Sequence, residues 1–263
     1  MAELPRAGWD DLARECDLWR KSRARPTLWW RDDDAVAVTP ALAELRRLAG
    51  VPLALAVIPM APAAPLADDL GAYIGDWRLA SVLQHGVGHL NHAASGDKKS
   101  EFPATRDLAE MELALQMGRG VLRSAFGPRF LPVLTPPWNR IADAALPLLP
   151  RLGLRGLTRF DELPYGRRGT AIPGIVEINT QIDVIDWRGS RGFVGEGVAL
   201  GRLAAHLAAR RNGTCAVEIP TGILTHHLVH DTATWRFLEN LQDWLARRGE
   251  LDLFLDPPSL WLP

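Results

Sequence analysis

The chain has 263 residues and a net charge of −1, because 30 lysines and arginines are balanced by 31 aspartates and glutamates. A hydrophobic fraction of 47% and a charged fraction of 23% are typical of a folded protein with a sizeable core. A nucleic-acid partner is not expected, because such partners need a strongly basic surface. The two cysteines, Cys16 and Cys215, are far apart and predict neither a disulfide framework nor a thiolate metal site.

No linker or repeat divides the sequence, so we expect one domain over residues 1–263. The first residues lack the apolar stretch of a signal peptide, and no apolar run approaches the ~20 residues of a membrane-spanning helix. The sequence therefore predicts a cytoplasmic protein without a transmembrane segment. It gives no indication of an oligomeric state.

Short apolar runs alternate with longer segments of helical periodicity, which is typical of β–α units around a parallel sheet. The number of runs favours a closed or nearly closed barrel over an open doubly wound sheet. In a barrel, side chains that carry chemistry lie at the C-terminal ends of the strands. In chain order we expect a helix at about 8–24, a strand at 27–31, a helix at 39–50, strands at 52–58 and 80–84, a helix at 104–127, a strand at 129–135, a helix at 140–153, strands at 154–158 and 175–180, a helix at 198–213, a strand at 214–219, a helix at 232–250 and a strand at 251–255.

An acidic run, Asp32 to Asp34, directly follows the first expected strand. Three adjacent carboxylates repel one another, so a folded chain needs a reason to hold them together. Alone, the run is more typical of a solvated loop in which Asp34 or Thr39 caps the next helix.

Six of the seven histidines lie in two short segments, each after an expected strand. The spacing of His85 and His89 lets both imidazoles face one point if the backbone turns helically there. Such clustering indicates a metal site or acid–base chemistry rather than surface histidines. The seventh, His206, is interpreted as an ordinary residue on a helix surface. The clustered histidines are His85, His89, His92, His226, His227 and His230.

Two further motifs follow expected strands. Consecutive prolines precede Trp138 and would present it rigidly at the rim of a site, although a plain turn into a helix is equally compatible. Asp183 and Asp186 lie beside Trp187, and buried aspartates are costly unless they orient another group, such as a histidine.

The order of these motifs resembles that of the polysaccharide deacetylases, also called the NodB-homology group or carbohydrate esterase family 4. The series consists of paired aspartates, HxxxH, a proline-rich turn, DxxDW and LxH, and it spans nearly the whole chain. The resemblance implies a distorted (β/α)7 barrel that holds one divalent metal, most often Zn²⁺.

The resemblance also implies roles for individual residues. Asp34, His85 and His89 would bind the metal, and Asp33 would be the general base. Asp32 is an additional carboxylate, so the choice between Asp32 and Asp33 as the base stays open.

His226 would be the general acid that protonates the leaving amine, and Asp186 would orient it. The backbone N–H of Trp138 would stabilise the oxyanion of the tetrahedral intermediate. Further contacts with the substrate are expected from Pro137, Trp187, Leu224 and Arg140.

The sequence departs from the family pattern at Thr135, where the family has an arginine that contacts the base. Either Arg140 or Arg31 is expected to supply this charge. We therefore expect a metal-dependent hydrolase that removes an acetyl group from the amide nitrogen of a small or lipid-linked N-acetyl sugar. Two alternatives stay open: a C–N hydrolase acting on a non-sugar amide, and a barrel that binds metal without turnover.

Overall fold

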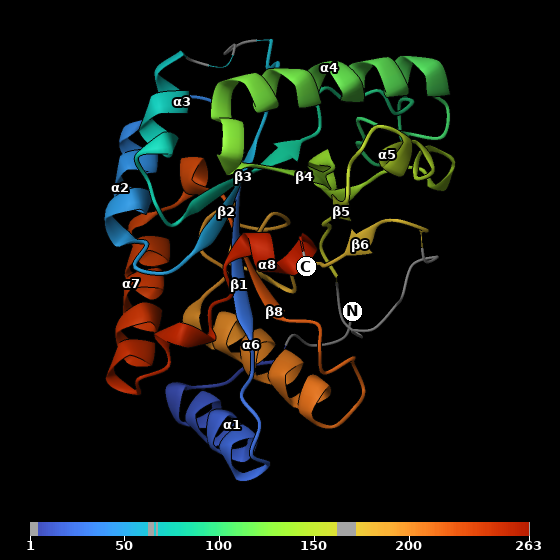
Figure 1. The fold of residues 1–263 in the computed structure, drawn as a ribbon. Coiled ribbons are helices and arrows are strands. Elements are labelled where there is room, and N and C mark those ends of the chain that lie inside the picture. The colour runs from blue at the N-terminus through green and yellow to red at the C-terminus, as the bar shows by residue number, and fades with distance from the viewer. Residues whose placement is uncertain (1–4, 63–65, 67, 162–171, 263) are drawn as a thin grey trace.

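The computed structural model describes residues 5–62, 66, 68–161 and 172–262. Its strands form one eight-stranded parallel sheet in the order β6-β5-β4-β3-β2-β1-β8-β7, and helices pack around it (Figure 1). None of the described helices combines the length and apolar character needed to cross a bilayer. The strands are β1 Leu28–Ala35, β2 Leu53–Val57, β3 Ala80–His85, β4 Phe130–Thr135, β5 Gly156–Leu157, β6 Val176–Glu177, β7 Ile182–Asp183 and β8 Thr221–Thr225. The helices are α1 Trp9–Lys21, α2 Pro40–Leu48, α3 Asp68–Gly75, α4 Leu108–Phe126, α5 Leu148–Arg151, α6 Glu196–Arg211, α7 Thr232–Arg247 and α8 Pro257–Trp261.

The two edges of the sheet are joined by one broken strand. β6 pairs with β5, and β7 a few residues later pairs with β8. Between them, the amide of Thr180 donates to the carbonyl of Arg159, and the amide of Gln181 donates to the carbonyl of Gly222, both at 2.9 Å. Counting β6 and β7 as one strand gives seven strands in a ring, which confirms the expected distorted (β/α)7 barrel.

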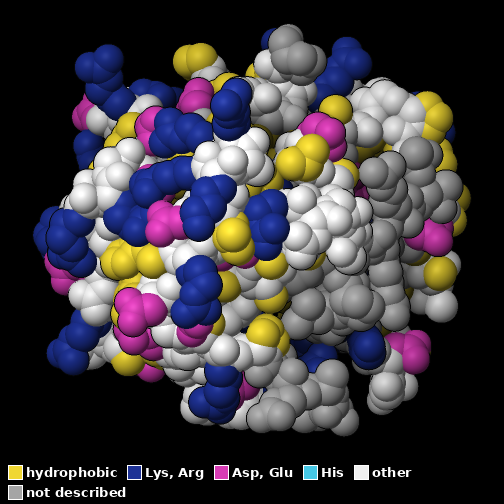
Figure 2. Space-filling view, turned by 90° about the horizontal axis from the view of Figure 1, so that it is seen from below, with side chains coloured by type: hydrophobic (Ala, Val, Ile, Leu, Met, Phe, Trp, Pro, Cys, Tyr) yellow, Lys and Arg dark blue, Asp and Glu magenta, His cyan; other side chains and the backbone are white. Residues whose placement is uncertain are grey.

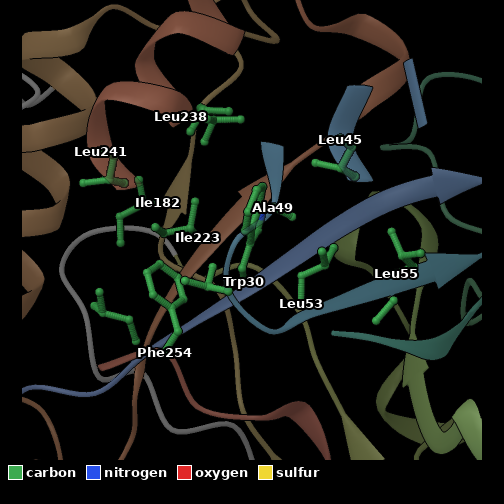
Figure 3. Packing of buried hydrophobic residues seen from close by; sticks show 14 of the residues in the cluster. Trp30, Leu45, Ala49, Leu53, Leu55, Ile182, Ile223, Leu238, Leu241 and Phe254 are labelled. Carbon is green, nitrogen blue, oxygen red and sulfur yellow. The ribbon is translucent and has the colours of Figure 1, made fainter. Parts of the chain in front are cut away.

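Strand β1 separates two cores because its side chains alternate between the faces of the sheet. Trp30 lies in the outer cluster, among residues of α2, β2, β8 and α7 (Figure 3). Trp29 lies in the inner cluster and packs edge-on against Trp261 of α8, with ring centroids 5.4 Å apart. The same alternation places the side chains of Arg31 and Asp32 on opposite sides of the sheet.

The face that is seen from below the view of Figure 1 carries charges of both signs (Figure 2). No described histidine side chain is visible on this face. The ion pairs of the chain include that between Arg25 and Asp252 at 2.7 Å and that between Arg211 and Glu15 at 2.7 Å.

The strand expected at 214–219 is wrong. That segment has no regular structure, and its Val217 is 46% exposed. The buried strand β8 begins only after Pro220, where Gly222 makes room for a tryptophan. A Cβ at Gly222 would lie 2.3 Å from Nε1 of Trp29. Packing against Trp29 therefore fixes the strand at a position where glycine and threonine weaken the sequence signal.

Other elements are shorter than expected, among them the strands at 154–158 and 175–180, which are reduced to β5 and β6. The segment 251–255 forms a 3₁₀ turn and a single bridge from Phe254 to Leu28, not a strand. The helix expected at 140–153 is reduced to a 3₁₀ turn and the four-residue α5. Pro147 and Pro150 account for this, because neither has the N–H that a helical turn requires.

His206 is not the surface residue that the sequence suggested. Its side chain is only 2% exposed, and its Nδ1 lies 2.8 Å from the hydroxyl of Thr221. Burial lowers the pKa of His206 to about 3, so the imidazole is neutral in the folded protein. In the unfolded chain a histidine titrates near its ordinary pKa of about 6.5.

Because the folded pKa is the lower one, His206 contributes its full stability above about pH 6.5 and loses it as the pH falls toward 3. In this interval the unfolded chain binds one proton that the folded protein does not. The free energy of unfolding therefore falls by roughly 1.4 kcal/mol for each pH unit. We expect His206→Gln to lose stability less steeply than the unmodified protein between pH 6.5 and 4.5, as measured by urea unfolding. Parallel losses in the two proteins would contradict this expectation.

Candidate metal and catalytic site

The candidate site lies at the C-terminal ends of β1 and β3. Asp34 is next to the last residue of β1, His85 ends β3, and His89 lies in the loop that follows. The backbones of Asp34 and His89 are left-handed, with φ of 74° and 55°. Left-handed backbone is costly for these residue types, and such strain is concentrated at functional sites. At Asp34 it interrupts the strand alternation, so that Asp33 and Asp34 can both face the site.

The ligand atoms of Asp34, His85 and His89 lie within 4.8 Å of one another. Nε2 of His85 is 3.0 Å and Nε2 of His89 is 3.5 Å from Oδ1 of Asp34. Ligands of a tetrahedral zinc ion, each about 2.1 Å from the metal, are separated by about 3.4 Å. Nδ1 of His85 lies 3.0 Å from the carbonyl of Thr135, a contact that leaves Nε2 for a metal. Two imidazoles and one carboxylate therefore fit a divalent metal such as zinc.

The electrostatic environment of this cluster favours positive charge. Burial alone would lower the pKa of His85, but Asp33 and Asp34 raise it above its usual value. Burial would likewise favour neutral Asp34, but the hydrogen bond with His85 and the neighbouring imidazoles hold its pKa well below the usual range. Asp34 is thus ionised and suited to bind a cation.

Asp33 and Asp32 have different environments in the structure. Asp33 is 2% exposed and faces Arg31, whose Nη2 donates to Oδ2 at 3.0 Å and whose Nε lies 2.9 Å from Oδ1. Asp32 is fully buried on the opposite side of β1. It accepts hydrogen bonds from the hydroxyl of Thr225 at 2.6 Å and from the amide of His227 at 3.0 Å, and it contacts Nδ1 of His227. Of the two carboxylates, only Asp33 lies beside the candidate ligands.

Arg31, one of the two arginines expected to supply this charge, contacts Asp33. It is fully buried, and its guanidinium also donates to the hydroxyl of Thr158 and to Oδ1 of Asn139, both at 2.9 Å. Arg140 is exposed instead, and its Nη1 donates to the carbonyl of Lys99 at 2.9 Å. The charge beside Asp33 therefore comes from its own strand.

The structure brings His226 to the site but does not bring Asp186 to His226. Nε2 of His226 lies 3.9 Å from Oδ2 of Asp33. The carboxylate of Asp186 accepts the amides of Gly189 at 3.0 Å and Ser190 at 3.3 Å, so it stabilises its own turn.

Asp183 interacts electrostatically with His226, as Asp34 does, and burial raises the pKa of Asp183. Nε1 of Trp187 donates to Asp183 at 2.9 Å, and the Trp187 ring packs edge-on against His226 with centroids 4.7 Å apart. The DxxDW motif contains both carboxylates, and its spacing does not show which of them points inward.

The remaining expected residues are near the site. Trp138 lies in a 3₁₀ turn with a left-handed backbone, φ 55°, and its ring packs on His89 with centroids 4.4 Å apart. Pro137 is buried against Gly86, where a Cβ would lie 2.6 Å from the proline ring. Leu224 is fully buried in β8, where it pairs with Arg31 on one side and Asp183 on the other. His92, by contrast, is exposed and outside the ligand cluster.

Glu101 is a residue of the site that sequence analysis missed. Its side chain is 2% exposed and accepts the amides of Val87 at 3.0 Å and Gly88 at 2.7 Å, within the loop between the two histidines. Gly86 has φ +56°, and a Cβ there would lie 2.0 Å from Oε2 of Glu101. Glu101 and the absence of a side chain at Gly86 together fix the loop that carries His89.

No protein-family model and no curated protein sequence matches the chain. Solved structures do match. A carbohydrate esterase family 4 esterase of Streptococcus mutans has a TM-score of 0.55 at 12% identity, over 93% of this chain and 90% of that chain. The peptidoglycan N-acetylglucosamine deacetylase Bc1960 has a TM-score of 0.53 at 14% identity, over 89% and 87%. A family 4 acetyl xylan esterase of Clostridium thermocellum has a TM-score of 0.50 at 14% identity, over 89% of both chains. The chain therefore has the fold of the polysaccharide deacetylases of carbohydrate esterase family 4, the family that its motifs resemble.

Proposed function

We propose that the protein is a metal-dependent deacetylase that removes an acetyl group from the amide nitrogen of an N-acetylated sugar. The observation that carries this proposal is the cluster of Asp34, His85 and His89, with Asp33 and His226 beside it. Asp34, His85 and His89 would hold one divalent metal, for which we expect zinc. When bound, this metal would polarise the acetyl carbonyl and make a water easier to deprotonate.

The side chains around the cluster are suited to the proton transfers of amide hydrolysis. Asp33, which forms an ion pair with Arg31, would take a proton from the attacking water. The backbone N–H of Trp138 would stabilise the negative charge that develops on the carbonyl oxygen. His226 would protonate the leaving amine, which is a poor leaving group without a proton. Asp183, in place of Asp186, would hold Trp187 against His226.

Two of the similar structures support the metal and the substrate class. The Clostridium thermocellum esterase contains a cobalt ion. Bc1960 is a deacetylase of N-acetylglucosamine in peptidoglycan, and it was solved with an N-hydroxybenzamide, a hydroxamate of the kind that chelates divalent metals.

The proposal is tested by metal analysis combined with acetate release from N-acetyl sugars, O-acetyl sugars and non-sugar acetamides. We expect about one zinc per chain and acetate release from N-acetyl sugars. His89→Ala should lose the metal, whereas His92→Ala, which removes an exposed histidine three residues away, should keep it. His226→Ala should keep the metal and lose amide hydrolysis more than ester hydrolysis, because an alkoxide leaves more readily than an unprotonated amine.

Each alternative has its own outcome in this experiment. Turnover of non-sugar acetamides alone would favour a different C–N hydrolase. Stoichiometric zinc without turnover of any substrate would identify a barrel that binds metal only. Absence of metal after reconstitution with zinc would refute the proposal and both alternatives.

The role of Glu101 leads to a separate expectation about metal affinity. Glu101→Ala leaves the amides of Val87 and Gly88 without an acceptor and releases the loop of His89. We expect zinc to bind about 10- to 100-fold more weakly, as measured by competition with a chelator. Glu101→Gln keeps one acceptor oxygen and should lose less. The exposed Glu239→Ala on α7 is the matched control, and equal zinc affinity in Glu101→Ala and Glu239→Ala would contradict the role.

A further inference from the structure

A cleft of about 410 Å³ lies beside the turn that carries Trp138. Residues between 93 and 104 form one wall, and residues 139–142 form the other. The walls are joined by a β-bridge between Phe102 and Ile141, and the amide of Ala142 donates to the carbonyl of Phe102 at 2.8 Å. Binding pockets for small molecules typically have volumes of about 300–1,000 Å³, so the cleft can hold one sugar ring with a substituent.

Asn139 connects the cleft to the candidate catalytic site. This residue lines the cleft, follows Trp138 in the chain, and accepts a hydrogen bond from Arg31, which holds Asp33. An acetamido group placed at Asp33 and Trp138 would therefore leave the rest of the sugar within reach of the cleft.

Most of the charged side chains that line the cleft are cationic. Lys98, Arg140 and Arg159 are opposed by one acidic lining residue, Asp97. Arg159 is paired with Glu177 at 2.7 Å. Among the residues that the structure describes, no carboxylate forms an ion pair with Lys98 or Arg140. These two cations are therefore not neutralised, although the whole chain has a net charge of only −1.

Two contacts connect these cations to the turn of Trp138. Nη1 of Arg140 donates to the carbonyl of Lys99, which orients the guanidinium at the cleft wall. The ammonium of Lys99 lies 6.0 Å from the centre of the Trp138 ring, at the outer limit of a cation–π contact. The cationic wall thus begins at the turn of Trp138 itself.

We propose that the substrate of this site carries an anionic group, a phosphate or a carboxylate, that binds in the cleft between Lys98 and Arg140. This inference rests on the proposed function and narrows its substrate to acidic N-acetyl sugars. The planar fork of an arginine matches the oxygens of both kinds of anion, and the flexible lysine adds a point charge.

The experiment compares kcat/KM for four substrates: N-acetylglucosamine, its 1-phosphate, its 6-phosphate and an N-acetylated uronic acid. The variants are Lys98→Gln/Arg140→Gln and the control Lys21→Gln/Arg247→Gln, which removes two exposed cations remote from the cleft. We expect one acidic sugar to exceed N-acetylglucosamine by at least about tenfold at low salt, with the advantage falling as salt rises. The cleft variant should lose about 10- to 100-fold on that substrate only. Preference for a sugar phosphate or for the uronic acid shows whether the cleft binds a phosphate or a carboxylate.

A second measurement keeps this inference separate from the proposed function. Binding of glucosamine 6-phosphate, glucosamine 1-phosphate and the uronic acid amine is measured by calorimetry, which requires no turnover. Salt-sensitive binding that is lost in the cleft variant, without hydrolysis of any substrate, would refute the deacetylase activity and support anion binding in the cleft. Equal hydrolysis of neutral and acidic sugars would support the deacetylase activity and refute anion binding in the cleft. If there is no hydrolysis and no binding, both proposals are refuted.

Discussion

Asp33→Asn is expected to reduce kcat for acetate release by about 10²- to 10⁴-fold while the metal stays bound. The asparagine keeps an oxygen that can accept a hydrogen bond from Arg31, but its amide cannot take a proton from water. Because Asp33 is not among the three candidate ligands, the metal content should not change. The measurement is steady-state acetate release together with elemental analysis of the same preparation.

Asp32→Asn is the matched control, since it makes the same change one residue earlier on the opposite face of the strand. The carboxylate of Asp32 makes three polar contacts with Thr225 and His227, so its replacement should mainly lower the free energy of unfolding. The folded fraction should retain kcat within about tenfold, because Asp32 is not in the site. If Asp32→Asn lost the chemical step and Asp33→Asn kept it, the assignment of the base would be wrong by one residue.

Most of the barrel could be predicted from the sequence, because strands such as β2 are continuous apolar runs separated by amphipathic helices. The pairing that closes the barrel could not be predicted, since the strand expected at 175–180 is reduced to β6 and the two-residue β7 was not expected, and both exist through pairing with β5 and β8. The position of β8 was missed for a related reason. The packing of Trp29 on Gly222, which fixes it, joins residues far apart in the sequence.

The grouping of Asp34, His85 and His89 could be predicted, because residue type, spacing and motif order are the signal for a candidate metal site. The partners of those residues could not. Glu101 lies more than ten residues after the loop that it fixes, and no spacing rule connects it to Val87 or Gly88. The choice between Asp183 and Asp186 depends on which side chain points inward at the end of β7, and a DxxDW pattern does not contain this information.

Arg31→Met is expected to lower the free energy of unfolding by about 3–5 kcal/mol, because it leaves the Asp33 carboxylate buried without a counter-ion. Methionine preserves most of the apolar volume of the arginine stem, so the loss reports the unpaired charge and the lost hydrogen bonds to Thr158 and Asn139. Urea unfolding measures the change. The exposed Arg140→Met, in which the same atoms are removed from a solvated side chain, should change stability by less than about 0.5 kcal/mol.

The double variant Arg31→Met/Asp33→Asn separates the charge pair from the other contacts of Arg31. If the cost in Arg31→Met arises from an uncompensated carboxylate, neutralising Asp33 should return part of the lost stability, giving a coupling energy of about 1–3 kcal/mol. Additive losses would show that Arg31 acts only through Thr158 and Asn139. The interpretation of Thr135 depends on this result. A strong coupling means that Arg31 on β1 supplies the charge that an arginine at the position of Thr135 supplies in the family. The departure at Thr135 then leaves Asp33 with a counter-ion.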